Sequence, residues 1–386
     1  MTDIGIVIVG YKNAEGVERL LSSINNVDFD GDKVTLIFSI DFSGDDSVKS
    51  LAEKFKWNNG NKIIIAHTEN LGLKEHILSC GNYIDKYGFD ALIVLEDDLY
   101  VSPEMYKYTK GAVEYYKDNP KIAGISLYKH EFNINAKHPF GEYVDCGDTF
   151  FIQYAQSWGQ VWLKKQWNQF RQWYSEKKYE LIADEKLPNN IKKWEKSWLK
   201  YHIMYCIDQD LYFVYPRISL STNFSASGTH TLYTNTSMQV PLCYNKKSDW
   251  FFTDFDKSLS VYDAFFENVR IKEKLGLENL EIDLYGIKKY KSSTNYVITR
   301  KSLPYKVIKS WGMYLRPLDA NIINNIKGDD LFLYDLNKSQ SPNTKKSNKE
   351  QILEYDLKGI NIYNTTNLRL CGRKLIRRIK TKLKIK

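Results

Sequence analysis

The chain of 386 residues is 43% hydrophobic and 26% charged with only nine prolines, a composition that indicates folding over most of its length. Its net charge of +8 lies at one end: residues 369–386 carry nine basic and no acidic side chains, and subtracting this +9 leaves the remainder at about −1, which excludes a generally basic, nucleic-acid-binding surface. The sequence has no apolar stretch near the roughly 18–20 residues of a spanning helix, no signal-peptide pattern and no Cys-x-x-Cys pair among its five cysteines, so we expect a cytoplasmic protein with reduced thiols.

Short apolar runs alternate with amphipathic helical patterns over the first hundred residues. The apolar runs cover residues 4–9, 34–40, 62–66 and 91–95, and the helical patterns cover residues 15–24, 47–55 and 73–87. Repeated strand and helix units predict an α/β fold with a mostly parallel, doubly wound sheet. Since such sheets bind ligands at the carboxyl ends of their strands, we expect a site near Tyr11, Asp41 and Glu96–Asp98.

Three consecutive carboxylates, Glu96, Asp97 and Asp98, follow the apolar run Ala91–Leu95. This run is short, β-branched near its middle and apolar on both faces, as expected of a central parallel strand. Like charges at the end of a buried strand repel each other unless a cation or hydrogen-bond donors hold them. Their hard oxygen atoms suit Mn²⁺ or Mg²⁺, with water and substrate phosphate completing the coordination shell. The alternative is a solvated acidic turn.

The chain beyond residue 100 divides into further segments. We expect a helix over residues 103–116 and a strand over residues 122–128. The six tryptophans of residues 140–235 indicate an aromatic core or, alternatively, a surface on which sugar rings stack. The expected units are a domain over residues 1–240, a mixed extension over 241–336, a flexible linker over 337–350 and a terminal segment over 351–386.

The basic tail, Arg369–Lys386, has the pattern of an amphipathic helix. Leu375, Ile376, Ile379 and Leu383 fall at helical spacing, and basic residues crowd the other positions. Such a helix lies on an anionic membrane surface, where each nearby cation contributes about 1 kcal/mol. Peripheral attachment to the inner face of the cell membrane is therefore the preferred hypothesis, with a solvated terminus and RNA contact as alternatives.

Several motifs occur in the order found in a known enzyme family. They are Asp41 after Leu36–Ile40, Asn70–Lys74, Leu95–Leu99, Ser157–Gly159, Trp194–Trp198, Tyr215–Leu220, Asn223 and Ser227–His230. Over residues 4–235 their order resembles glycosyltransferases of the Rossmann-like GT-A fold. The likeness is greatest to the N-acetylglucosaminyltransferase I-like branch and its family 2-like bacterial relatives in surface-polysaccharide synthesis. That group has Glu-Asp-Asp-Leu where many other glycosyltransferases have Asp-x-Asp.

The resemblance implies a separate role for each carboxylate of the acidic motif. Asp98 would be the metal ligand, Asp97 would lie near the ribose, and Glu96 would face the donor sugar or the acceptor. By the same resemblance, Tyr11 and Asp41 would line the uridine pocket.

Three further positions would complete the donor site. Lys74 would lie near the nucleotide or its diphosphate, where a flexible ammonium acts as a point charge. His76 would be its neighbour, although an ordinary helix-surface histidine is the alternative. His230 would close over the diphosphate and exclude water, unless it is a loop residue without chemistry.

An inverting transfer also requires a base that takes the proton from the acceptor hydroxyl. The related enzymes have an aspartate between two tryptophans, and this chain has Glu195 between Trp194 and Trp198. The longer side chain leaves Asp208 and Asp210 as alternatives for the base. A second reading of Glu195 is a surface partner of the neighbouring lysines.

Together these features predict an inverting, metal-dependent glycosyltransferase that moves a hexosyl or N-acetylhexosaminyl group from a nucleotide-sugar donor, expected to be UDP-linked. The acceptor would be a glycan or a lipid-linked saccharide, and tethering by the basic tail would raise the local concentration of enzyme near a membrane-bound acceptor. A sugar-phosphate nucleotidylyltransferase is an alternative, but the chain lacks a Gly-rich phosphate loop after its first strand. A non-catalytic glycan-binding protein is the other alternative.

Overall fold

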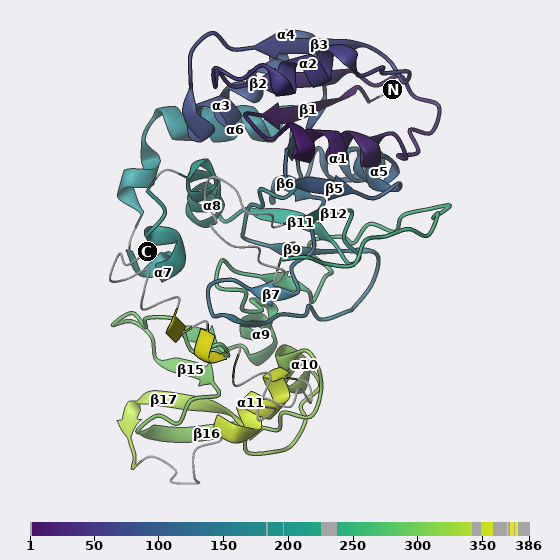
Figure 1. Ribbon diagram of the computed structural model, residues 1–386. Helices are drawn as coiled ribbons and strands as arrows, with labels where there is room; N and C mark the ends of the chain where they lie inside the picture. The colour runs from purple at the N-terminus through teal and green to yellow at the C-terminus, as the bar shows by residue number, and fades with distance from the viewer. Residues whose placement is uncertain are drawn as a thin grey trace.

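The computed structural model shows two units of unequal size (Figure 1). It describes residues 2–182, 184–195, 197–224, 238–341, 349–357, 369, 371–373 and 375–376. The larger unit is built on a nine-stranded sheet and the smaller one on a four-stranded sheet near the C-terminal end of the chain.

The large sheet has the strand order β13-β9-β11-β6-β10-β4-β1-β2-β3. Its strands are β1 (Ile4–Gly10), β2 (Leu36–Ile40), β3 (Lys62–Ala66), β4 (Ala91–Glu96), β6 (Ile122–Ser126), β9 (Thr149–Ile152), β10 (Gln160–Leu163), β11 (Tyr212–Pro216) and β13 (Val261–Tyr262). Five of the eight neighbouring pairs are parallel, and β10 runs antiparallel between β4 and β6. The predicted mostly parallel α/β sheet is confirmed.

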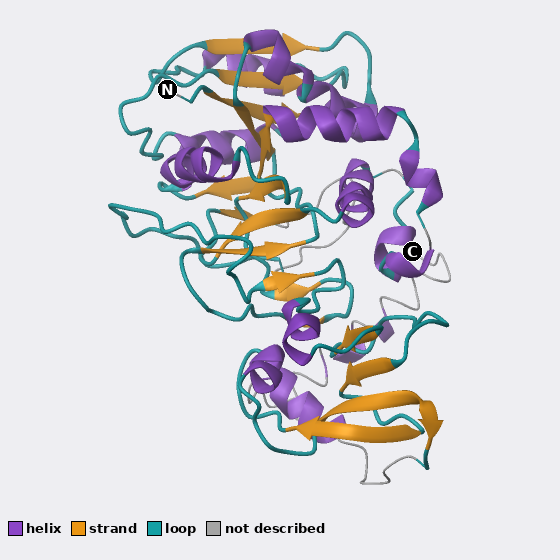
Figure 2. Ribbon diagram, turned by 180° about the vertical axis from the view of Figure 1, so that it is seen from behind, coloured by secondary structure: helices purple, strands orange, loops and turns teal. Residues whose placement is uncertain are grey.

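Helices cover both faces of this sheet, as the view from behind shows (Figure 2). One apolar core receives residues from α1 (Ala14–Ile24), α2 (Ser47–Lys54) and α5 (Met105–Tyr116). The opposite core receives residues from α3 (Gly72–Cys80), α4 (Asn82–Tyr87), α6 (Lys164–Ser175), α7 (Asn189–Lys192) and α8 (Trp198–Gln209). The sheet is therefore doubly wound, as the sequence predicted.

The alternating side chains of β1 explain why one strand joins both cores. Ile6 and Ile8 belong to the first core, and Val7 and Val9 belong to the second. Each side chain is almost fully buried, and burying one contributes roughly 1.5–3 kcal/mol. A central position of β1 follows from this two-sided burial.

The smaller unit begins where the large sheet ends. Its sheet has the order β14-β15-β17-β16. The elements are α9 (Arg270–Leu275), β14 (Leu280–Asp283), β15 (Tyr296–Thr299), β16 (Tyr305–Trp311), α10 (Leu318–Ile323), β17 (Leu331–Ser339) and α11 (Lys349–Leu357). The smaller C-terminal unit is as expected, although β13, at residues 261–262, belongs to the large sheet.

Ion pairs connect the smaller unit with the larger one. Asp356 of α11 pairs with Arg300 and with His138, which lies in β8 (His138–Pro139). Lys288 pairs with Asp263, which directly follows β13. The two units are therefore packed together by charged as well as apolar contacts.

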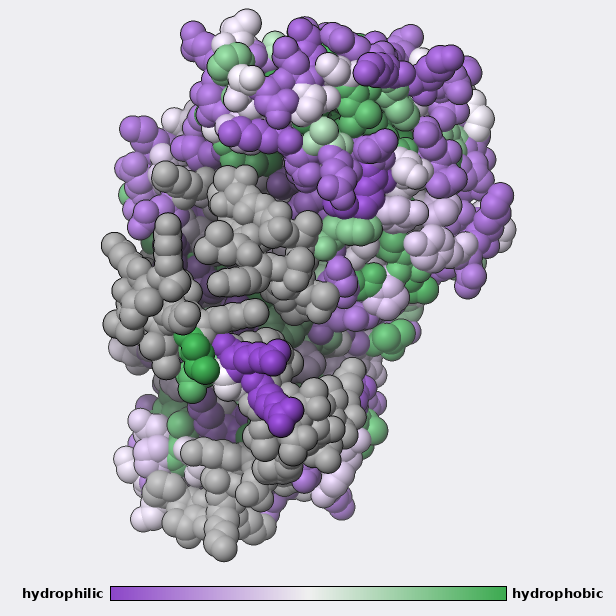
Figure 3. Space-filling view, in the orientation of Figure 1, coloured by the Kyte–Doolittle hydropathy of each residue, from purple (hydrophilic) through white to green (hydrophobic). Residues whose placement is uncertain are grey.

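The predicted linker and tail are covered only in part. Residues 342–348 of the linker and most of residues 369–386 lie outside the described residues, while the start of the linker belongs to β17. None of the helices that the structure describes has the length and apolar character needed to cross a membrane. The face in Figure 3 is mainly hydrophilic over the larger unit, with apolar residues in small patches.

Most tryptophans of residues 140–235 are part of the core rather than of a surface. Trp162, Trp167, Trp173 and Trp198 are buried, and only Trp158 and Trp194 are half-buried. The rings of Trp162 and Trp167 stack with centroids 3.8 Å apart. The first of the two readings of the aromatic segment, an aromatic core, therefore describes these residues.

His202 of α8 is buried in this aromatic core without a hydrogen bond. Its ring stacks on Phe170 with centroids 4.3 Å apart, and both ring nitrogens are without a partner among the described residues. Burial lowers the pKa of His202 to about 3. The unfolded chain therefore binds a proton below about pH 6.5 that the folded chain does not, so stability is lost as the pH falls toward 3.

Replacing His202 with phenylalanine should remove part of this acid sensitivity. When the pH is lowered from 7.5 to 5, one such buried histidine decreases the free energy of unfolding by about 2 kcal/mol. Urea unfolding at both pH values should show His202→Phe losing about 2 kcal/mol less than the unchanged protein. Equal losses in the two proteins would contradict a neutral, buried His202.

Candidate functional site

The acidic motif lies where β4 ends, at the carboxyl edge of the parallel strands. Glu96 is the last residue of β4 and pairs with Val9 of β1. Asp97 and Asp98 form the turn that leads into β5 (Leu99–Val101). The predicted juxtaposition of the motif with the ends of neighbouring strands follows from this register.

Burial raises the pKa of all three carboxyls, and the charge of neighbouring carboxylates adds to the effect for Glu96 and Asp97. The pKa of Glu96 is raised well above its usual value by burial and by the two neighbouring aspartates. Burial and the charge of Asp98 raise the pKa of Asp97 to about 6, and burial raises that of Asp98. The turn therefore holds negative charge at an energetic cost.

Hydrogen bonds satisfy only part of this acidic cluster. Asn13 Nδ2 donates to Asp97 Oδ1 over 3.3 Å, and Asn223 Nδ2 donates to Asp98 Oδ2 over 2.6 Å. By contrast, Glu96 Oε1 and Asp98 Oδ1 are buried and have no hydrogen-bond partner among the described residues. Buried acceptors left unpaired are costly, so a bound donor or cation would stabilise them.

The chemistry of these two oxygens fits a hard divalent cation. Within the described residues, no group of three or more His, Cys, Asp and Glu side chains is arranged to hold a metal. Mg²⁺ typically binds through one or two carboxylates and completes its shell with water and substrate phosphate. Glu96 and Asp98 match that mode, in which the protein alone does not form a complete metal cage.

Asp41 positions the loop beside the motif. Its carboxylate accepts hydrogen bonds from the backbone N–H groups of Leu71 at 2.8 Å and Gly72 at 3.0 Å. Gly72 has a φ of +73°, a conformation that favours glycine. Asp41 thus fixes the start of α3 against the end of β2, and the structure uses both of its oxygens for this purpose.

His76 lies one layer behind the site rather than at its surface. Its Nε2 is 2.8 Å from Ser39 Oγ, which is also 3.0 Å from the Tyr83 hydroxyl. Burial lowers the pKa of His76 to about 4, so the ring is neutral near pH 7. The residue is therefore neither an exposed helix-surface histidine nor, in this structure, exposed to a ligand.

Lys74 and Tyr11 lie at the edge where the donor was expected. Lys74 is half-buried, forms an ion pair of 3.0 Å with Glu75 and lies 5.7 Å from the centre of the Tyr201 ring. Tyr11, also half-buried, directly follows β1, and its backbone helps to lower the pKa of Asp97 against the effect of burial. Both positions agree with the predicted edge, whereas their donor contacts remain predictions.

Glu195 is exposed in the segment that precedes α8. Near the start of α8, the Tyr201 ring lies 5.7 Å from Lys74 Nζ of α3, and α3 begins beside Asp41 at the carboxyl edge. Asp210, just after the other end of α8, pairs with Lys121, which precedes β6. Since β6 runs parallel to β4, α8 begins on the side of the carboxyl edge.

This direction of α8 separates the candidates for the base. Glu195 lies before the end of α8 that faces the carboxyl edge, and Asp210 lies at the opposite edge of the sheet. Asp208 also lies toward that opposite end and accepts a hydrogen bond from Trp173 Nε1. The placement favours Glu195 over both aspartates. His230 and the rest of Ser227–His230 lie outside the described residues.

The structure adds residues that sequence reasoning missed. The Arg19 guanidinium lies 3.8 Å from the centre of the Phe224 ring, and its charge lowers the pKa of Asp97 and Asp98 against the effect of burial. The Phe224 backbone N–H donates to the Asp98 carbonyl over 2.8 Å. No motif reveals Arg19, because its proximity to Asp98 depends on how α1 packs against the β4–β5 turn.

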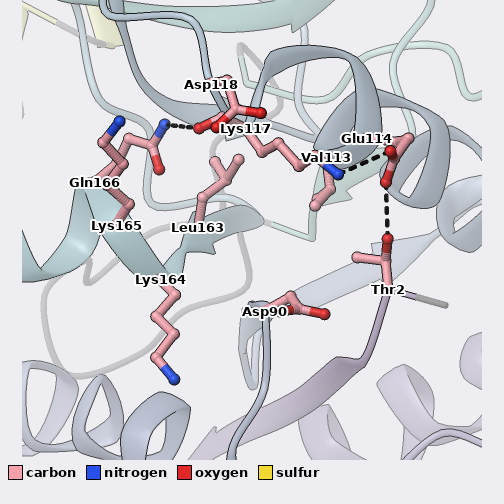
Figure 4. Close-up of a pocket in the computed structure, with 10 residues that line it drawn as sticks. All are labelled: Thr2, Asp90, Val113, Glu114, Lys117, Asp118, Leu163, Lys164, Lys165 and Gln166. Carbon is pink, nitrogen blue, oxygen red and sulfur yellow. Dashed lines mark hydrogen bonds and ion pairs between the residues drawn. The ribbon is translucent and has the colours of Figure 1, made fainter.

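A cavity of about 620 Å³ lies away from this cluster (Figure 4). It is bordered by α5, by the start of α6 and by Thr2 and Asp90, which precede β1 and β4. Among its charged residues, Lys117 pairs with Glu114 over 2.8 Å. Its position at the amino edge of the sheet separates it from the acidic cluster.

Comparison with known proteins gives only distant structural likenesses. No family model matches the chain, and no curated protein matches it. TarS 1-349 from S. aureus in complex with UDP-GlcNAc is 15% identical, with a TM-score of 0.38 over 60% of each chain. The mannosyltransferase PcManGT from Pyrobaculum calidifontis, in complex with GDP-Man and Mn²⁺, is 13% identical, with a TM-score of 0.29 over 42% of this chain and 44% of its own. At such values the likeness does not assign an activity.

Gly16 determines how closely α1 approaches the acidic turn. A Cβ at this position would lie 2.3 Å from the Asp97 carbonyl oxygen and 2.1 Å from Asn13 Nδ2. Asn13 is both the N-cap of α1, through the Gly16 N–H, and a donor to Asp97. An added methyl group would therefore displace the helix start from the turn.

We expect Gly16→Ala to weaken Mn²⁺ binding about tenfold, because overpacking of about 1–3 kcal/mol falls on the turn that carries Asp98. Gly111→Ala is the matched control, since its Cβ would meet the Phe252 ring at 2.7 Å, away from the turn. Calorimetric titration with Mn²⁺ should separate the two variants. Equal Mn²⁺ affinity in both would contradict the role of Gly16.

Proposed function

We propose that this protein is an inverting, divalent-metal-dependent glycosyltransferase. The observation that carries the proposal is the pair of buried carboxylate oxygens, Glu96 Oε1 and Asp98 Oδ1, without protein partners among the described residues at the carboxyl end of β4. In a doubly wound sheet this is where ligands bind. A nucleoside diphosphate would bring the phosphate oxygens that an incomplete protein metal site lacks.

Asp98 would hold the metal ion, and we propose Glu96 as a second ligand, in place of the contact with the donor sugar or acceptor that the sequence led us to expect. When bound, the ion neutralises negative charge that develops on the leaving nucleoside diphosphate. Asn223 keeps Asp98 oriented through its hydrogen bond to Oδ2, which leaves Oδ1 for the cation. Arg19 reduces the repulsion within the acidic cluster while the metal ion is absent.

Glu195 would accept the proton of the attacking acceptor hydroxyl. Its exposed carboxylate precedes α8 on the side of the carboxyl edge. The role of base does not require direct contact between Glu195 and the acidic turn. Tyr11, Asp41 and Lys74 would line the nucleotide and diphosphate region, and His230 would cover it. Asp41 would act there chiefly by holding the loop at Leu71 and Gly72.

The donor is proposed to be a UDP-linked hexose or N-acetylhexosamine and the acceptor a glycan or lipid-linked saccharide of surface-polysaccharide synthesis. The support for these substrates is the sequence resemblance at residues 4–235. Attachment of Arg369–Lys386 to an anionic membrane is part of the same proposal and would place the enzyme beside a lipid-linked acceptor. A glycan-binding protein without chemistry gives no role to the acidic cluster.

Asp98→Asn should separate metal binding from the rest of the fold. The variant loses the negative charge that would face the cation. Changing a residue that only supports a metal ligand typically weakens metal binding by up to about 100-fold, so we expect Asp98→Asn to weaken Mn²⁺-dependent UDP binding by about 100-fold. Asp118→Asn, an exposed carboxylate at the amino edge, is the control. UDP calorimetry with and without Mn²⁺ measures the effect, and undiminished metal dependence in Asp98→Asn would overturn the metal assignment.

Glu195→Gln should lower kcat for sugar transfer by about 10²- to 10⁴-fold, the usual contribution of a general base, and leave the affinity for the UDP-sugar unchanged. A screen of UDP-sugars by UDP release first identifies the donor. Asp208→Asn serves as the matched control and should retain transfer, because Asp208 lies toward the opposite edge of the sheet. Full transfer by Glu195→Gln would eliminate Glu195 as the base.

A further inference from the structure

A groove of about 570 Å³ is bordered by α3, the start of α4 and α6, and α3 and α6 lie near each other in Figure 1. Pockets of roughly 300–1,000 Å³ bind ligands of drug size, so this volume exceeds what a single ion requires. The residues that border it come from only these helices. They are Glu75, Leu78, Ser79, Asn82, Trp167, Asn168, Phe170, Arg171, Gln172, Tyr174 and Ser175.

The groove combines an aromatic base with a polar rim. Trp167 and Phe170 are fully buried, whereas Asn82 and Gln172 are exposed. The rim includes three side-chain amides, two serine hydroxyls and one residue of each charge, Glu75 and Arg171. Amide and hydroxyl groups match the mixed donors and acceptors of sugar hydroxyls, and the balanced charges favour a neutral ligand.

Trp167 forms the rigid base of the groove. Its side chain is 1% exposed, and Nε1 has no hydrogen-bond partner among the described residues. The indole edge that carries Nε1 lies against Gly81, where a Cβ would meet Nε1 at 2.1 Å. Gly81 stands between Ser79 and Asn82 of the rim, so the close packing of the indole against Gly81 fixes these rim residues above the aromatic base.

One end of the groove reaches the carboxyl edge of the sheet. α3 begins at Gly72 beside Asp41, and α6 begins at the opposite edge, where the Lys164 N–H donates to the Asp90 carbonyl over 2.9 Å. The two helices therefore run in opposite directions, and the groove end near Glu75 and Tyr174 is the one beside the acidic cluster. Lys74 lies at this end of the groove, because it interacts with both Glu75 and the Tyr174 hydroxyl.

The same end of the groove adjoins α8. The Tyr174 ring lies 5.1 Å from that of Tyr201, measured between centroids, and Lys74 lies 5.7 Å from the Tyr201 ring. Tyr201 belongs to the first turns of α8, shortly after Glu195. A chain that occupies the groove would thus end close to the residue proposed as the base.

We propose that this groove binds a neutral saccharide chain, the part of the acceptor that lies beyond the reacting sugar. This inference rests on the proposed glycosyltransferase function. The saccharide would extend from the carboxyl edge at Tyr174 along α3 and α6 toward Asn82. The amides of the rim, at Asn82, Asn168 and Gln172, would pair with the sugar hydroxyls above the aromatic base.

The test is direct binding of trisaccharides to the full chain without a UDP-sugar or metal. Chitotriose, maltotriose and cellotriose are titrated calorimetrically, and at least one should bind. Gln172→Ala should weaken that binding about three- to tenfold through a lost hydrogen bond. Gln169→Ala is the matched control, an exposed glutamine of the same helix that does not border the groove, and it should bind as the unchanged protein does.

Asn82→Trp blocks the groove from an exposed rim position and should abolish trisaccharide binding, while thermal unfolding checks that the variant remains folded. Failure of all three trisaccharides to bind, or equal binding by Asn82→Trp, would overturn the groove proposal. UDP binding with Mn²⁺ is measured on the same samples. Metal-dependent UDP binding without trisaccharide binding would contradict only the groove proposal. Trisaccharide binding without UDP binding would contradict the transferase proposal instead.

Discussion

The crowding of Glu96, Asp97 and Asp98 at the buried end of β4 is the constraint on which the site depends. Burial raises the pKa of each carboxyl, like charge adds to this for Glu96 and Asp97, and the fold offers only partial compensation. Asn13 at the start of α1 and Asn223 of β12 (Ser221–Asn223) each pair with one aspartate. Two oxygens remain without partners among the described residues, and their chemistry fits a hard divalent cation that they would hold.

The candidate site residues and the structural ion pairs lie at opposite edges of the large sheet. At the carboxyl ends of β1, β2 and β4 lie Tyr11, Asp41 and the acidic cluster, and the loop at Gly72 is tied to Asp41. At the amino edge, Asp210 pairs with Lys121 and the cavity of Figure 4 is bordered by charged residues. The direction of α8 then favours Glu195 as the base, since chemistry at one edge cannot use a carboxylate held at the other.

The groove between α3 and α6 lies between the aromatic core and the polar surface. Its base belongs to the aromatic core, where Trp167 stacks on Trp162, and its rim is polar. Its end at Tyr174 meets Lys74 and Tyr201, so that nucleotide, base and saccharide regions would converge at the start of α8. An enzyme that extends a glycan requires both a saccharide groove and a donor site at the same edge, whereas a protein that only binds sugar has no need of the donor site.

The sequence by itself determined the first four strands of the large sheet, the strand at residues 122–126, the helices between them and the location of the acidic motif, because two-sided burial leaves a local pattern of apolar residues that Ile4–Gly10 and Ala91–Glu96 both show. It did not reveal β9, β10 and β13, or that β10 lies antiparallel between β4 and β6. It placed Tyr11, Asp41 and Glu96–Asp98 at one edge, since parallel strands share their carboxyl ends. Only the tertiary structure decided that Asp41 holds a loop, that His76 is buried behind it, that Arg19 lies beside the aspartates and that Asp208 and Asp210 lie away from the acidic cluster. These outcomes depend on helix packing and direction, which bring together residues that are distant along the chain and leave no local signal.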